Sequence, residues 1–113
     1  MRELDRVREI CLGLPDVNEK ASHGEPTWFV KKRTFASFAF HHHDNRVAVW
    51  CAAPPGIQEL LIGSSPNQFF RPPYVGPSGW VGIYLDVDVD WDEVGEILRQ
   101  AHAHIEAKSS RKR

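Results

Sequence analysis

The sequence has few cysteines and no long apolar run. Its 113 residues include only Cys11 and Cys51, which lack the dense, even spacing of a secreted disulfide scaffold. The residues after Met1 are charged, and no segment reaches the roughly 18 apolar residues that span a bilayer. We therefore expect a cytoplasmic protein with two buried free thiols and no insertion into membranes.

A large net charge of either sign is also missing. The chain has 14 Lys+Arg against 15 Asp+Glu, a net charge of −1, so any binding of nucleic acid must come from a local patch. The 42% hydrophobic and 11% aromatic residues are typical of a globular protein. A chain of this length supports one core. We expect a single domain over residues 1–107 and a basic, flexible tail over residues 108–113.

Signatures of catalysis and of cofactors are absent as well. No serine lies in a nucleophile elbow, and Gly76, Gly79 and Gly82 surround a predicted strand instead of preceding a helix as in a phosphate loop. The histidines of residues 41–43 offer two ligands on one strand face, too few for zinc. The acidic residues of 86–93 lack calcium-loop spacing. We expect no enzyme activity, no metal and no cofactor; a histidine metal site and a Cys-His nucleophile pair are the less favoured alternatives.

The first half of the chain contains a helical pattern followed by strand patterns. Apolar residues recur every three or four positions over residues 2–14, which predicts an amphipathic helix. Residues 15–26 have no periodicity and predict a surface loop. Three apolar segments then predict a meander, with a tight basic turn between the first two strands. These strands are residues 27–30, 34–42 and 46–51.

The second half predicts a short helix, two strands and a long helix. Residues 54–63 begin with two prolines and form the short helix. Residues 68–71 predict a short strand, and residues 79–88 alternate clearly. Asp90 caps a final amphipathic helix. The order α-β-β-β-α-β-β-α with short connections predicts an α+β fold, an antiparallel sheet packed by the terminal helices.

Basic and aromatic side chains are the candidates for binding. Cations at predicted hairpin turns are suited to contact phosphates, although turns also carry charge for solubility. The candidate phosphate contacts are Lys31, Lys32, Arg33, Arg46 and Arg71. Aromatic side chains form either a groove for a base, small ligand or peptide, or the core and its rim. The aromatic candidates are Trp28, Trp50, Phe70, Trp80 and Tyr84.

Several short motifs occur in a fixed order between the two terminal helices. They are His23-Gly24-Glu25-Pro26-Thr27-Trp28, residues 32–38, residues 70–74 and Gly79-Trp80-Val81. With the final helix, this set resembles the MmcQ/YjbR family of small bacterial proteins over nearly the whole chain. The resemblance implies an architecture related to secretion-chaperone-like proteins and DNA binding through a "double wing" of β-hairpins. It supplies no catalytic residues, and a Ser-Tyr pair frequent in the family's last helix is replaced here by residues 100–102.

The leading functional hypothesis is a cytoplasmic DNA-binding protein that contacts phosphates through the basic hairpins. Direct reading of bases is not expected, because no basic recognition helix is evident. Two alternatives stay open. One is a protein-interaction module, chaperone-like or homodimerising, and the other is a small-ligand site lined by the tryptophans.

Overall fold

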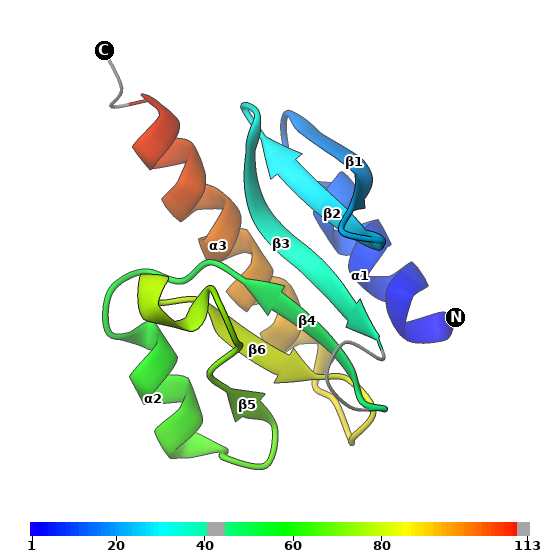
Figure 1. Ribbon diagram of the computed structural model, residues 1–113, viewed down its shortest axis with the longest axis vertical. Coiled ribbons are helices and arrows are strands. Elements are labelled where there is room, and N and C mark those ends of the chain that lie inside the picture. Colours follow the sequence, from blue (N-terminus) through cyan, green and yellow to red (C-terminus); the bar gives the residue numbers. More distant parts are fainter. Residues whose placement is uncertain (41–44, 111–113) are drawn as a thin grey trace.

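The computed structural model describes residues 1–40 and 45–110. In these ranges the chain forms three α-helices and a six-stranded antiparallel sheet of order β1-β2-β3-β4-β6-β5 (Figure 1). The predicted α+β class is confirmed. The elements are α1 (Arg2–Leu12), β1 (Val17–Ser22), β2 (Glu25–Val30), β3 (Arg33–Phe40), β4 (Val47–Cys51), α2 (Ile57–Ser64), β5 (Phe69–Phe70), the 3₁₀ turn η1 (Gly76–Ser78), β6 (Val81–Tyr84) and α3 (Trp91–Ser110).

The predicted loop over residues 15–26 is wrong, because β1 and the start of β2 lie within it. The two strands pair from Val17 opposite Val30 to Ser22 opposite Glu25. They are joined by His23 and Gly24, with φ of 55° and 82°. Positive φ at both central residues is the geometry of a type I′ turn, which matches the twist of a tight hairpin. The meander therefore has four strands instead of three.

Helices α1 and α3 lie together against one face of the sheet (Figure 1). The inward residues of the strands and the apolar stripes of both helices form one buried cluster, as alternation and the 3.6-residue period require. Its fully buried members include Val7, Cys11, Trp28, Val30, Phe35, Val49, Cys51, Val81, Ile83, Val94, Leu98 and Ala101. The opposite face of the sheet, which we call the open face, is covered by neither α1 nor α3 (Figure 1).

A β-bulge at Phe35 sets which residues of β3 reach the open face. Trp28 pairs with Ala36 and Phe29 with Thr34, so Phe35 is an extra residue on β3. Phe35 and Ala36 are both fully buried, and Phe35 meets the ring of His102 on α3 edge-on at 5.3 Å. Beyond the bulge, alternation resumes and directs Ser37 to the open face.

The cap of the last helix was predicted correctly. The Asp90 carboxylate accepts hydrogen bonds from the backbone amides of Asp92 (3.0 Å) and Glu93 (3.3 Å), which satisfies two donors that the first turn cannot pair internally. The helix continues to Ser110, so residues 108–110 of the predicted tail are helical; residues 111–113 lie outside the described residues. None of the helices described is long and apolar enough to cross a membrane.

Helix α2 holds the segment that connects β5 to β6. Gln58 is 4% exposed, and its side-chain amide donates to the carbonyl oxygens of Gly76 (2.9 Å) and Trp80 (2.5 Å). The Gly76 carbonyl also accepts the Gly79 amide at 2.9 Å within η1. The Gln58 amide therefore ties this turn to Trp80, the residue before β6. The 74–80 segment is thereby fixed over the open face, where it borders a pocket.

Candidate functional site

Three of the five predicted phosphate contacts lie together at the β2–β3 turn. Lys31 and Lys32 have φ of 51° and 70° and form the two-residue turn, and Arg33 opens β3. All three are exposed. The basic turn is therefore located as predicted, and whether these side chains contact DNA stays a prediction.

Arg46 lies away from this turn, and its side chain interacts with other residues of the chain. Its guanidinium donates two hydrogen bonds to the Asp86 carboxylate (2.9 and 2.8 Å) and stacks 3.8 Å from the centre of the Tyr84 ring. The Arg46 guanidinium also holds the pKa of Asp86 below its usual range. Val47 pairs with Phe40 at the far end of β3 from the basic turn, about 23 Å away at the rise of a strand.

Arg71 follows β5 and makes a different contact from Arg46. Its side chain is exposed and packs over Gly76, where a Cβ atom would lie 2.6 Å from the Arg71 Cγ. Only a glycine allows this approach. The structure thus gathers Lys31, Lys32 and Arg33 but not Arg46.

The predicted aromatic groove is divided among three places. Trp28 is fully buried in the core, where its indole N–H donates to Glu19 at 2.9 Å. Phe70 and Tyr84 stack on each other with ring centres 4.4 Å apart. Trp50 and Trp80 alone border a cavity on the open face.

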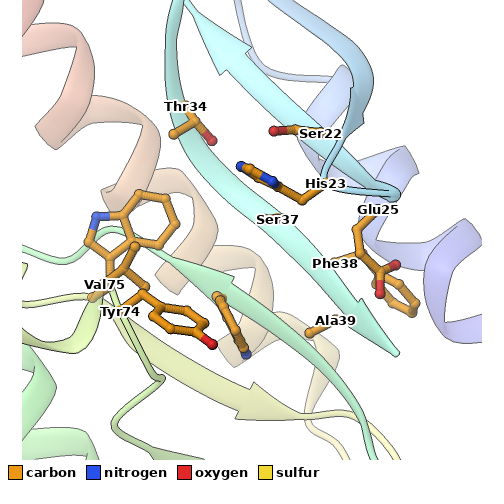
Figure 2. A pocket seen from close by; sticks show the side chains of 11 residues that line it. Ser22, His23, Glu25, Thr34, Ser37, Phe38, Ala39, Tyr74 and Val75 are labelled. Carbon is orange, nitrogen blue, oxygen red and sulfur yellow. The ribbon is translucent and has the colours of Figure 1, made fainter. Parts of the chain in front are cut away.

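That cavity is a pocket of about 480 Å³ on the open face, within the size range of small-molecule sites. Strands β3 and β4, the β1–β2 turn and the 74–80 segment surround it. The lining residues are Ser22, His23, Glu25, Thr34, Ser37, Phe38, Ala39, Trp50, Tyr74, Val75 and Trp80. Figure 2 shows Tyr74 and Val75 across the pocket from Glu25, with His23 and Thr34 at one end.

One side of the pocket is aromatic. Trp50 reaches it from β4, opposite Ser37 on β3 and Gly82 on β6. Tyr74 and Trp80 come from the segment that Gln58 holds. Tyr74 is 76% exposed and has a φ of 68°, a left-handed conformation that is uncommon for a bulky residue.

The other side of the pocket carries its polar groups, beside Phe38 and Ala39. His23 stands on the I′ turn, and Glu25 opens β2. One carboxylate oxygen of Glu25 accepts a hydrogen bond from the Phe40 amide at 3.1 Å. The hydroxyl of Ser37 shares a hydrogen bond with that of Thr27 at 3.1 Å. These bonds fix polar groups at the pocket before any ligand arrives.

No nucleophile or metal centre emerges in the part of the chain that the structure describes. Cys11 and Cys51 are fully buried, and burial raises the pKa of the Cys51 thiol to about 12 and that of Cys11 further; a protonated thiol is inert. No group of three or more His, Cys, Asp or Glu side chains there could hold a metal ion. The histidine run of residues 41–43 lies outside the described residues.

Sequence reasoning missed Glu25, Tyr74 and His23 as pocket residues. The sequence does indicate the positions of His23 and Glu25. If residues 17–22 are taken as a strand, His23-Gly24 has the composition of a two-residue hairpin turn. Such a turn places Glu25 at the start of the next strand. Tyr74 had no such signal, since its position depends on the long connection from β5 to β6.

Comparisons with known proteins agree with this fold. A family model described as YjbR matches residues 12–104. The crystal structure of Deinococcus radiodurans protein DR2400, with a DUF419 family-model domain, superposes with a TM-score of 0.78 at 21% sequence identity, covering 90% of this chain and 77% of that one. No curated protein matches the chain. At this identity the structural likeness concerns the fold alone.

Proposed function

The chain belongs to the YjbR family, and from this premise we propose that it is a non-catalytic binding protein that holds a small ligand in the pocket on the open face. A cytoplasmic location is part of the proposal, since both cysteines are free, buried thiols. The fold comparison supplies no ligand, so the proposal stands on the geometry of the site.

The observation that carries the proposal is a preformed pocket with two chemically different walls. Its volume of about 480 Å³ suits a small molecule. Trp50, Tyr74 and Trp80 offer large apolar contact area, and the polar side chains opposite can fix a ligand's orientation. Because Gln58 anchors the 74–80 segment, little ordering is needed upon binding.

A neutral aromatic probe tests this use of the pocket. We expect indole at millimolar concentration to shift the NMR signals of the Trp50 and Trp80 indole N–H groups. Tyr74→Ala should weaken indole binding at least about twofold, as expected from the loss of one aromatic contact of about 0.5–1.5 kcal/mol. Leu60→Ala is the matched control, because Leu60 is similarly exposed but lies on α2. Shifts confined to residues outside the pocket, or the absence of any shift, would contradict the proposal.

A second candidate function is DNA binding at the β2–β3 turn, which the clustering of exposed Lys31, Lys32 and Arg33 favours. Phosphate contacts by these cations displace counterions. Arg46 is not included, because its guanidinium already bonds Asp86. For three contacts, the logarithm of the binding constant for duplex DNA should fall with the logarithm of salt concentration at a slope of about −2.7.

The DNA hypothesis is tested by titrating duplex DNA at several salt concentrations. Charge reversal of Lys31 and Lys32 should flatten the slope by about two units, whereas Arg2→Glu on α1 should leave it unchanged. No binding at low salt would eliminate this function. The protein-interaction alternative gains no comparable support, since the exposed large apolar residues of the described chain are scattered over different segments: Met1, Leu12, Leu60, Tyr74 and Val87.

A further inference from the structure

We propose that the pocket on the open face selects an organic cation, of the class in which an ammonium group carries methyl or other apolar substituents. This inference rests on the proposed small-ligand function and specifies its ligand chemistry. It follows from the charge of the pocket, from the state of Glu25 and from the aromatic wall.

The charge of the lining favours a cation over an anion. Glu25 is the one carboxylate among the lining residues of the described chain, and none of these residues is a lysine or arginine. The lining thus brings one carboxylate to the ligand and no lysine or arginine to offset it. A phosphate-bearing ligand would be repelled here, whereas a cation would be attracted.

Three of the hydrogen-bonded carboxylates in the described chain have an arginine partner, whereas Glu25, like the helix cap Asp90, is bonded by backbone amide alone. Glu19, Asp86 and Glu96 each pair with an arginine at 2.8–2.9 Å. In residues 1–40 and 45–110, by contrast, no cationic side chain forms an ion pair with Glu25, whose carboxylate accepts a hydrogen bond from the Phe40 amide. A half-buried carboxylate without a counter-ion loses hydration that one amide only partly replaces. A bound ligand cation would provide the missing partner.

The aromatic wall explains why the cation should be organic. Trp50, Tyr74 and Trp80 present ring surfaces that attract a cation at the ring face, most strongly for tryptophan. These rings cannot coordinate a bare metal ion, and their apolar area instead suits methyl groups on nitrogen. The same attraction operates within the chain, where Arg46 lies over Tyr84 at 3.8 Å and Arg6 over Trp91 at 4.8 Å.

The ligand's remaining part should be small and polar. Ser22, Thr34 and Ser37 bring hydroxyl groups to the wall that also carries Glu25, and hydroxyls donate or accept hydrogen bonds as required. An amphipathic cation with an alcohol or carbonyl group therefore matches both walls. A nucleobase would also suit the rings, but the phosphates of a nucleotide would find no cation in the lining.

The proposal is tested with choline and its uncharged isostere 3,3-dimethylbutan-1-ol, two probes of the same shape. We expect calorimetric titration to show choline binding at least about tenfold more tightly, in keeping with a desolvated cation–π and carboxylate contact. Glu25→Gln can still accept the hydrogen bond from Phe40. It should lower the preference for choline to below about threefold without weakening the binding of the alcohol. Glu59→Gln, on the exposed side of α2, should leave the preference intact.

The outcomes separate this inference from the proposed function. Equal affinity for choline and the alcohol, or an unchanged preference in Glu25→Gln, overturns the cation assignment. Tighter binding of adenosine monophosphate than of adenosine overturns it as well, since the pocket would then favour an anion. If indole binds and choline does not, only the cation assignment fails. If neither indole nor choline binds, both proposals fail together.

Discussion

Replacing Glu19 is expected to loosen the edge strand β1 from the rest of the domain. The Glu19 carboxylate accepts two hydrogen bonds at 2.9 Å from Arg8 on α1, with a third contact at 3.2 Å, and one from the Trp28 indole at 2.9 Å. It thus ties β1 to a helix and to the neighbouring strand. Because Trp28 is fully buried, its N–H group has no access to water as a substitute.

The size of the effect depends on what replaces Glu19. Alanine removes the acceptor that Trp28 and Arg8 share. Leaving the buried Trp28 donor unpaired costs about 1–3 kcal/mol, and the partly exposed ion pair with Arg8 contributes about 0.5–1 kcal/mol. We expect Glu19→Ala to lower the free energy of unfolding by about 2–3 kcal/mol. Glutamine keeps an acceptor for Trp28 and loses only the charge, so Glu19→Gln should cost about 1 kcal/mol.

The effect should also depend on pH. The hydrogen bonds from Arg8, and secondarily the one from Trp28, lower the pKa of Glu19 against the opposing effect of burial. The ionised form therefore favours the folded state. Its contribution is fully present above the unfolded pKa of about 4.3 and is lost as the pH falls through the lower folded pKa. The difference between the wild type and Glu19→Gln should shrink in this acidic range.

Urea unfolding followed by tryptophan fluorescence at pH 7, 5 and 3 measures these differences. Glu9→Gln is the control, because Glu9 is exposed on α1. A loss below about 0.5 kcal/mol for Glu19→Ala, less than a weak hydrogen bond contributes, would refute the reasoning. A difference between wild type and Glu19→Gln that stays constant down to pH 3 would refute the assigned role of charge.

Three further predictions concern the core and the pocket. Burial raises the pKa of Cys51 to about 12, so a disulfide reagent should label it only as fast as the protein unfolds, and rapid labelling of folded protein would contradict this. Gly82→Ala would place a Cβ 2.2 Å from the Phe70 ring; chemical denaturation should show a loss of about 1–3 kcal/mol, and no loss would mean that the ring moves freely. Gln58→Leu removes both bonds to the 76–80 segment and should weaken indole binding at least about threefold, as expected from a loss of about 1 kcal/mol per hydrogen bond; unchanged binding would show that the segment is held by other contacts.

The sequence predicted most elements because their periodicity reports the face that is buried. The alternation in residues 46–51 and the apolar stripe of the last helix agree with β4 and α3. Strand β1 was missed for a physical reason. Its core-side residue Glu19 is polar and is satisfied by Arg8, eleven residues earlier, so the strand has no apolar alternation. The bulge at Phe35 was likewise invisible, since it depends on pairing with β2.

The predicted site was recovered only where neighbours in sequence determine it. Lys31, Lys32 and Arg33 stay together because they form one turn. Arg46 does not join this cluster, because it forms an ion pair with Asp86. Asp86 is forty residues away in sequence, and the pairing of β4 with β6 brings the two side chains together. A one-dimensional count of cations cannot show which of them are already neutralised.

The pocket itself combines three parts of the chain that no local pattern links. The first residue of β2 is Glu25, β4 supplies Trp50, and Tyr74 comes from the long connection after β5. Each is unremarkable alone, since a carboxylate beside a hairpin turn is usually solvated and a tryptophan is usually core. Their meeting on the one sheet face that α1 and α3 leave uncovered turns these residues into a site with a defined charge. A net charge of −1 for the whole chain therefore conceals a basic turn at Lys31–Arg33 and an acidic, aromatic pocket that begins at the next residue of β3, Thr34. Ligands of opposite charge would be directed to these two places, so DNA binding and cation binding are separable by mutation.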